Sequence, residues 1–412
     1  MILTIKEYDK IQVRDKRNLA KYQISSSDAA LLQSLVIDDA PVFKWGNRCL
    51  VAQQWVGVIS LPDFSIEILP KISATMPHGE CRDILTRMLL VSHQPTTTKK
   101  IPSSVALHKN SLSEVLIATY LAALESYIKK GLLSSYVKVQ SNLDVVKGRI
   151  VFSKQFNQNV LSPTRFNCAY SKYIKDAPIN RFFLCCLNYM QAISKDSDNL
   201  RRIRAALTNF DGITTIDANT ALATKIAFNS TNAIAEEAYE YGKMFLMNNF
   251  VTLNAGRTTM NVMLFDMNKL YETFIYRCLR HAYGNKVKYQ YSKHYLVIDP
   301  STNRKFINLR PDIVLWRANG TAIVIDTKWK LPKSFAKESD AHQMNAYSTS
   351  IPGVNKVILL YPLTNNTMAF VGDYEFLSGD GHRRPFCIRA VDLSLCLSWS
   401  KFLEHITDLF EQ

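Results

Sequence analysis

The chain has 412 residues, 47% of them hydrophobic, and a formal net charge of +15 at pH 7. Its length suggests two or three globular domains, and its charge favours a polyanionic partner, most often nucleic acid, with an anionic membrane as the rival. No apolar run reaches the ~20 residues of a spanning helix, which excludes an integral helical membrane protein. The N-terminus, MILTIKEYDK, is charged too early for a secretory signal, so we expect a cytoplasmic protein.

The spacing of cysteines and histidines argues against zinc and disulfide frameworks. None of the eight cysteines forms a CxxC pair, and none of the eight histidines has a metal-ligand spacing to a cysteine or to a second histidine. Scattered cysteines in a long chain indicate reduced and mostly buried thiols. A zinc site is therefore not expected.

The N-terminal region, residues 1–105, is predicted to be a β-rich domain. Residues 48–72 alternate between apolar and polar positions, are rich in β-branched residues and contain a turn signal. A helix is predicted over residues 81–93. Residues 94–104, which hold two prolines in a polar cluster, are the clearest linker candidate.

The middle region, residues 106–255, is predicted to be mainly helical. A long helix is expected from Ser111, with Glu114 completing a capping box, and further helical blocks cover residues 178–210 and 231–250. Residues 129–181 hold ten Lys or Arg against two acidic residues. This basic stretch is either a solvated surface with uneven charge or a face for DNA or an acidic partner.

The C-terminal region, residues 256–412, changes pattern. A helix is predicted over residues 261–284, then a strand near 289–298, then two strands within INLRPDIVLWRANGTAIVIDTKWKL (307–331). A helix near 338–349 and an apolar strand at 356–362 follow. This order predicts an α/β layer built on a mixed sheet.

Two apolar runs in this region carry carboxylates. Asp312 lies in the first run, and Asp326 and Lys328 lie in the second. Continuously apolar strands are buried on both faces of a covered sheet, where an unpaired carboxylate costs several kcal/mol. A divalent cation would remove that conflict, and a nearby lysine could meet a phosphate oxygen or an activated water. The alternative is a pair of exposed strand ends with an Asp326–Lys328 salt bridge.

The turn at Asn319-Gly320 decides whether the two acids can cooperate. A two-residue loop would put Asp312 opposite Thr327 and turn Asp326 to the other face of the sheet. A three-residue loop with a left-handed glycine pairs Arg317 with Thr321 and sets Asp312 directly opposite Asp326. We predict the three-residue loop, or a bulge with the same effect, with both acids and Lys328 on one face.

The spacing Pro311-Asp312 followed by Asp326-Thr327-Lys328 resembles the PD-(D/E)xK nuclease superfamily. The resemblance implies that Asp312, Asp326 and Lys328 are catalytic and that the two acids bind Mg²⁺, with Mn²⁺ as a substitute. It implies two additions from helices: Glu272 as a further metal ligand, and Gln343 with Tyr347 as further catalytic residues that face the site and the substrate. The alternative for all three is an ordinary polar helix surface.

Longer segments resemble the McrC family, the nuclease subunits of McrBC-type modification-dependent restriction systems. They are LFDMNKLYETFIY (264–276), LRPDIVLW with IVIDTKWK (309–330), and HQMNAY (342–347). Residues 146–156 and 177–190 are similar to that family's middle region, and residues 55–72 to its N-terminal domain. The resemblance implies a C-terminal restriction-endonuclease-like domain at residues 256–412 and an N-terminal partner-docking domain at residues 1–105.

The family also implies partners. These are a McrB-like AAA+ GTPase ring whose hydrolysis the subunit stimulates, and double-stranded DNA, with dimerisation of nuclease domains across complexes as a further expectation. The sequence has no GxxxxGK[ST] loop, so it cannot be the motor itself. Two other functions stay open: a non-catalytic adaptor that activates an NTPase, and a structure- or RNA-directed nuclease that acts alone.

Overall fold

The chain forms two compact units. One combines Met1–Val115 with Asn248–Gln412, and the other is Leu116–Met247. The computed structural model describes residues 2–73, 75–93, 111–159, 164–248, 260–329, 335–377, 381 and 383–411. The predicted linker at 94–104 lies outside these described residues. The first unit unites both ends of the chain, and the predicted three-domain division stays a prediction.

The first sheet of this unit is completed by a strand from the C-terminal half. Its order is β1-β9-β8-β13, with β1 and β9 parallel and the other pairs antiparallel. The strands are β1 (Ile2–Lys6), β9 (Ser65–Leu69), β8 (Trp55–Ser60) and β13 (Asn261–Asp266). The predicted helix over 261–284 is therefore wrong in its first part, and α9 (Met267–Tyr283) begins only after Asp266, whose side chain accepts from Asn268 N. A short apolar run fits strand and helix equally by periodicity, and the partner β8 decides between them.

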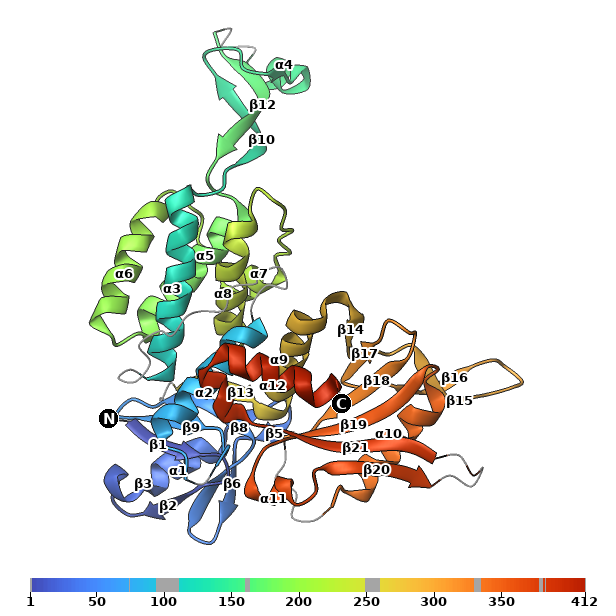
Figure 1. The fold of residues 1–412 in the computed structure, drawn as a ribbon. Coiled ribbons are helices and arrows are strands. Elements are labelled where there is room, and N and C mark those ends of the chain that lie inside the picture. The colour runs from blue at the N-terminus through green and yellow to red at the C-terminus, as the bar shows by residue number, and fades with distance from the viewer. Residues whose placement is uncertain are drawn as a thin grey trace. The chain divides into compact units, whose positions relative to one another are not determined.

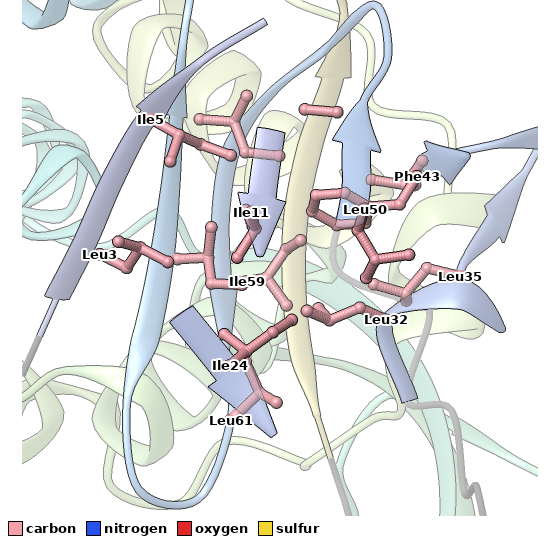
Figure 2. Close-up of a cluster of buried hydrophobic side chains, with 14 of the residues drawn as sticks. Leu3, Ile5, Ile11, Ile24, Leu32, Leu35, Phe43, Leu50, Ile59 and Leu61 are labelled. Atoms are coloured by element: carbon pink, nitrogen blue, oxygen red, sulfur yellow. The ribbon is translucent and has the colours of Figure 1, made fainter. Parts of the chain in front are cut away.

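A second N-terminal sheet shares its core with the first. Its order is β3-β2-β7-β6. Figure 2 shows the common core, to which Ile5 of β1, Leu50 of β7 and Ile59 of β8 belong. The elements of this part are β2 (Lys10–Arg14), η1 (Leu19–Lys21), β3 (Gln23–Ser25), α1 (Ser26–Gln33), β4 (Val36–Ile37), β5 (Ala40–Pro41), β6 (Phe43–Gly46), β7 (Cys49–Ala52) and α2 (His78–His93). The β-rich N-terminal region and the helix near 81–93 are confirmed.

The C-terminal part is built on a six-stranded mixed sheet of order β14-β17-β18-β19-β21-β20 (Figure 1). The pairs β18–β19 and β19–β21 are parallel and the other pairs are antiparallel, so the predicted mixed sheet is confirmed. Its strands are β14 (Val287–Tyr289), β17 (Ile313–Trp316), β18 (Ala322–Thr327), β19 (Val354–Pro362), β20 (Gly372–Leu377) and β21 (Arg383–Val391).

The predicted strand at 289–298 is split in two. Only β14 joins the large sheet, while β15 (His294–Ile298) pairs with β16 (Lys305–Leu309) in a separate hairpin. Gln290 interrupts the run, because it has a positive φ of 45° and donates its backbone N–H to Asp312 O at 2.7 Å. A left-handed residue turns the chain out of the sheet at this point.

Helix α10 (Glu338–Ser350) covers one face of this sheet, as predicted for residues 338–349. Its buried Met344 and Tyr347 pack in one cluster with Val314 and Val324. Elsewhere Phe274 of α9 stacks on Phe402 of α12 at 5.4 Å. The remaining elements are η4 (Gly284–Lys286), α11 (Asn365–Met368), η5 (Leu393–Leu397) and α12 (Trp399–Glu411). Among the described residues, no helix combines the length and hydropathy needed to cross a bilayer.

The second unit is helical with a small sheet, which was not predicted. The sheet has order β10-β12-β11 and carries much of the basic stretch 129–181. The elements of this part of the chain are α3 (Leu112–Lys130), β10 (Ser135–Leu143), β11 (Arg149–Ile150), α4 (Phe152–Gln158), β12 (Phe166–Ile174), α5 (Pro178–Ile193), α6 (Ser197–Leu207), η2 (Thr208–Phe210), α7 (Ala218–Ala223), η3 (Ala233–Ala235) and α8 (Glu236–Asn248). All eight cysteines of the chain are free and buried, as expected.

Candidate active site

The β17–β18 hairpin has the register that the sequence predicts. Trp316 pairs with Ala322, and Arg317 N donates to Thr321 O at 2.8 Å. The loop is therefore the three-residue one, and its Gly320 has a left-handed φ of 81°. Because Ile313 pairs with Ile325, the preceding Asp312 lies directly opposite Asp326. The alternative two-residue register is excluded.

Asp326 and Lys328 form a buried ion pair beside this hairpin. Lys328 Nζ lies 2.6 Å from Asp326 Oδ2, and the side chain of Asp326 is only 1% exposed. Residues two apart on a strand share a face, so the acid and the lysine point the same way. The alternative of an exposed salt bridge at strand ends is wrong, because Asp326 is inside the protein.

Asp312 is oriented by the opposite strand. Its Oδ2 accepts hydrogen bonds from Thr327 N at 2.8 Å and from Thr327 Oγ1 at 2.9 Å. Burial, followed by the negative charge of Glu272, raises the pKa of Asp312. Burial, followed by the charge of Asp312, raises the pKa of Asp326. Two carboxylates thus share a site that disfavours their simultaneous ionisation.

Lys328 faces three polar side chains, two of them acidic. Besides Asp326 it reaches Gln343 Oε1 at 3.3 Å and Asp340 Oδ1 at 3.8 Å. Burial alone would lower the pKa of Lys328, but the charges of Asp326 and Asp340 outweigh it, and the pKa is raised. The ammonium group therefore stays charged in a largely enclosed position.

Gln343 and Tyr347 are linked to Lys328 by hydrogen bonds, and their role at the site stays a prediction. Gln343 Nε2 donates to the Tyr347 hydroxyl at 2.8 Å, which leaves Gln343 Oε1 for Lys328. Tyr347 is buried, at 3% exposed, so a solvated helix surface is not its environment. The chain of contacts Tyr347–Gln343–Lys328 fixes the position of the ammonium group.

Asp340 is the site residue that the sequence analysis missed. It lies in the first turn of α10, is buried, and faces Lys328. A signal was present, because Asp340, Gln343 and Tyr347 are three and four residues apart and so share a helix face. Asp340 belongs to no motif, and spacing alone gave no reason to choose it over the neighbouring Glu338.

Glu272 is near the site but is not brought into one ligand group with the two aspartates. Its Oε1 accepts from Gln290 Nε2 at 2.9 Å, and its charge raises the pKa of Asp312. Within the described residues no three His, Cys, Asp or Glu side chains are arranged to hold a metal ion. The metal role of Glu272 stays a prediction.

The two aspartates fit a hard divalent cation. Asp326 Oδ2 is buried and, apart from its ion pair with Lys328, has no hydrogen-bond partner among the described residues. Mg²⁺ is commonly bound by one or two carboxylates, with waters and substrate phosphates completing its octahedron. A facing pair of carboxylates therefore suffices as the protein's share of such a site.

Comparisons with known proteins find one matching family model and two similar solved structures. A family model described as "McrBC 5-methylcytosine restriction system component" matches residues 50–362. The whole chain is similar to a whole chain of the refined half-complex from a tetradecameric assembly of Thermococcus gammatolerans McrB AAA+ hexamers with bound McrC, with a TM-score of 0.65 and 18% identity. A second match is to the cryo-EM structure of the Thermococcus gammatolerans McrBC complex, with a TM-score of 0.49 and 20% identity over 68% of this chain and 87% of that chain. None of the curated proteins matches this sequence.

Proposed function

This chain belongs to the McrBC 5-methylcytosine restriction system family, and on that premise we propose that it is the Mg²⁺-dependent DNA endonuclease subunit of a McrBC-like restriction complex. It would cut modified or foreign double-stranded DNA when driven by a McrB-like AAA+ GTPase whose hydrolysis it stimulates. The observation that carries the proposal is the hairpin register, which sets Asp312 opposite Asp326 with Lys328 paired to the buried acid.

The residues divide the work of phosphodiester hydrolysis. Asp312 and Asp326 would hold Mg²⁺, with Mn²⁺ as a substitute, and the bound ion would lower the pKa of a water and neutralise charge on the phosphate. Lys328 keeps its proton and presents a positive charge to the phosphate oxygen on which negative charge develops. Gln343 and Tyr347 keep that ammonium group in place, and Thr327 keeps Asp312 turned toward the site.

We propose a McrB-like AAA+ partner for two reasons. The chain belongs to the McrBC family, and in the similar solved structure McrC is bound to McrB AAA+ hexamers. The chain has no phosphate-binding loop of its own. The N-terminal region, residues 1–105, is the docking surface implied by the resemblance. The β10–β12 ribbon of the second unit is the other candidate, because it and α4 expose four aromatic side chains, a feature of interaction surfaces: Tyr136, Phe152, Phe156 and Tyr173.

Deleting residues 1–105 cannot distinguish these candidates. Strand β8 pairs along its length with β13, so the deletion would strip the C-terminal half of its sheet partner. An internal deletion of the ribbon is cleaner, because Ser135 pairs with Ile174 and a short Gly-Ser turn can join residues 134 and 175. Loss of GTPase stimulation in this variant would assign docking to the ribbon, and normal stimulation would assign it to the first unit.

A reconstitution assay tests the function. The purified chain is incubated with methylated plasmid, Mg²⁺ and GTP, with and without the AAA+ partner. We expect cutting only when both proteins are present, and none in EDTA. Stimulated hydrolysis without cutting would favour the adaptor function, and cutting without the partner would favour a nuclease that acts alone. Either result would overturn the proposal. Dimerisation of nuclease domains across complexes, which would supply a site for each strand, is part of the same proposal.

A further inference from the structure

The hairpin of β15 and β16 exposes apolar side chains on both of its faces. Neighbouring residues of a strand point to opposite faces, and here four successive residues of β15, from Tyr295 to Ile298, are exposed. Phe306 and Ile307 of β16 are 41% and 62% exposed. We call this hairpin, residues 293–310, the arm (Figure 1). The chain's own core does not explain why a two-stranded ribbon outside the large sheet exposes apolar side chains on both faces.

The arm is also basic. It carries Lys293, Arg304, Lys305 and Arg310 against Asp299 alone. The Asp299 carboxylate accepts hydrogen bonds from the hydroxyls of Ser301 and Thr302 at 2.6 Å each, so it is engaged within its own turn. The Arg304 guanidinium lies 5.2 Å from the Phe306 ring centroid, and Lys305 Nζ lies 5.7 Å from that of Tyr295. Cations and apolar groups are thus interleaved along the arm.

The base of the arm is joined to the candidate active site. Arg310 donates to Gln290 Oε1, and Gln290 Nε2 donates to Glu272 at 2.9 Å. The backbone N–H of Gln290 donates to Asp312 O at 2.7 Å. Leu309, the last residue of β16, is buried in the core under α10. The second strand of the arm is therefore followed within a few residues by Asp312 of the site, and the contacts at its end fix it to the body of the protein.

We propose that the arm lies in the major groove of the duplex that the site cuts, an inference that rests on the proposed function. The major groove is wide enough for a two-stranded β-ribbon, phosphates lie along both of its walls, and thymine methyls offer apolar contacts within it. A ribbon with basic and apolar groups on both faces matches those surroundings. A second copy of the chain is a poorer occupant, because two arms of like charge would repel each other.

Charge reversal on the arm tests this. The full-length Arg304→Glu/Lys305→Glu variant is compared with Lys16→Glu/Lys401→Glu, which reverses two exposed lysines of the same unit and makes the same change in total charge. Binding to a fluorescent 30-base-pair duplex is measured by anisotropy in EDTA over a range of KCl concentrations. We expect the arm variant to bind the duplex about tenfold or more weakly. The slope of log K against log salt should become smaller in magnitude by about two, since each phosphate contact contributes ~0.9. The matched control should stay within about twofold of the unaltered protein.

Several outcomes would overturn the inference. They are an equal loss of duplex affinity in the two variants, unchanged duplex binding by the arm variant, and no duplex binding by the unaltered chain. A further one is that the arm variant changes only in its sedimentation, which would mean that a protein binds the arm. If circular dichroism shows that the reversal variant is misfolded, Arg304→Gln/Lys305→Gln replaces it. This variant should lose affinity and salt slope in the same direction, but by less. Plasmid cutting with Mg²⁺ and the partner is assayed in parallel. Arm-dependent binding without cutting would refute the proposed function alone, and cutting with arm-independent binding would refute the arm alone.

Discussion

Trp329 Nε1 donates to both carboxylate oxygens of Glu7, at 3.0 Å and 3.2 Å, across 322 residues of sequence. Trp329 directly follows Lys328, and its ring packs against Tyr271 with centroids 5.3 Å apart. Glu7 follows strand β1 and is completely buried. The residue after the candidate catalytic lysine is therefore anchored to the N-terminal sheet.

Glu7 should make the stability of the protein depend on pH. Burial raises its pKa from the ordinary 4.5 to about 8. Between these values the folded protein keeps a proton that the unfolded chain has lost, so this contribution to stability is present at low pH and is lost as pH rises toward 8. Glu7→Gln removes the titration. The unfolding free energy of the wild type relative to Glu7→Gln should fall by at least about 1 kcal/mol between pH 5 and pH 8.5, as measured by urea titration. A difference that stays constant with pH would contradict this.

The facing acids and their lysine should be indispensable for cutting. Asp312→Ala, Asp326→Ala and Lys328→Ala should each reduce plasmid cutting by at least ~10²-fold, because each removes a group that would act on charge in the transition state. Stimulation of the partner's GTP hydrolysis should persist in all three. Asp15→Ala, which removes an exposed carboxylate of the same unit, is the control. Full cutting by any of the three variants would remove that residue from the mechanism.

Gln343 and Tyr347 should act as a unit. Tyr347 reaches Lys328 only through the Gln343 amide, so Gln343→Ala should lower the cutting rate by about tenfold and Tyr347→Phe by less. The double variant should be no worse than Gln343→Ala alone, which is the signature of coupled residues in a double-mutant cycle. Single-turnover rates measure the cycle. Additive losses would show that the tyrosine hydroxyl has a separate role.

The conformation of the hairpin loop can be tested by stability alone. Gly320 has a φ of 81° and nothing within 4 Å of an added Cβ, so Gly320→Ala meets only backbone strain. A left-handed alanine costs roughly 1–2 kcal/mol. Gly79 has equally open space but lies in the first turn of α2, where alanine is favoured over glycine by up to roughly the 0.5–1 kcal/mol of a helix interior. The two variants should shift the urea midpoint in opposite directions, and a Gly320→Ala midpoint at or above the wild-type value would count against the three-residue loop.

The sequence predicted part of the local geometry of the site. The period of two along the strands left two loops possible at Asn319-Gly320, and the three-residue loop was chosen because only that register sets Asp312 opposite Asp326. The helical period places Gln343 beside Tyr347. These relationships join residues close in sequence, where dihedral preferences dominate. The mixed sheet followed from the order of the elements around them.

The remaining features depend on partners distant in sequence. Nothing near Val262 in the sequence reveals that it lies in a strand. Its partner in β8 is Ile59, about two hundred residues earlier in the chain. Glu7 could not be connected with Trp329 for the same reason. Glu272 was assigned by analogy to a helix position, and its hydrogen bond joins it to Gln290, 18 residues later in the chain. Long-range pairing thus limits what a single sequence reveals.

The pairing of β8 with β13 has a consequence for synthesis on the ribosome. When residues 2–93 leave the exit tunnel, β8 has β9 on one side only, and its other edge must wait until Asp266 has been made. An unpaired, buried-type strand edge is a template for association with other chains. The entire second unit is translated during that interval. Nascent chains stalled before residue 261 should therefore be the species that depends most on chaperones.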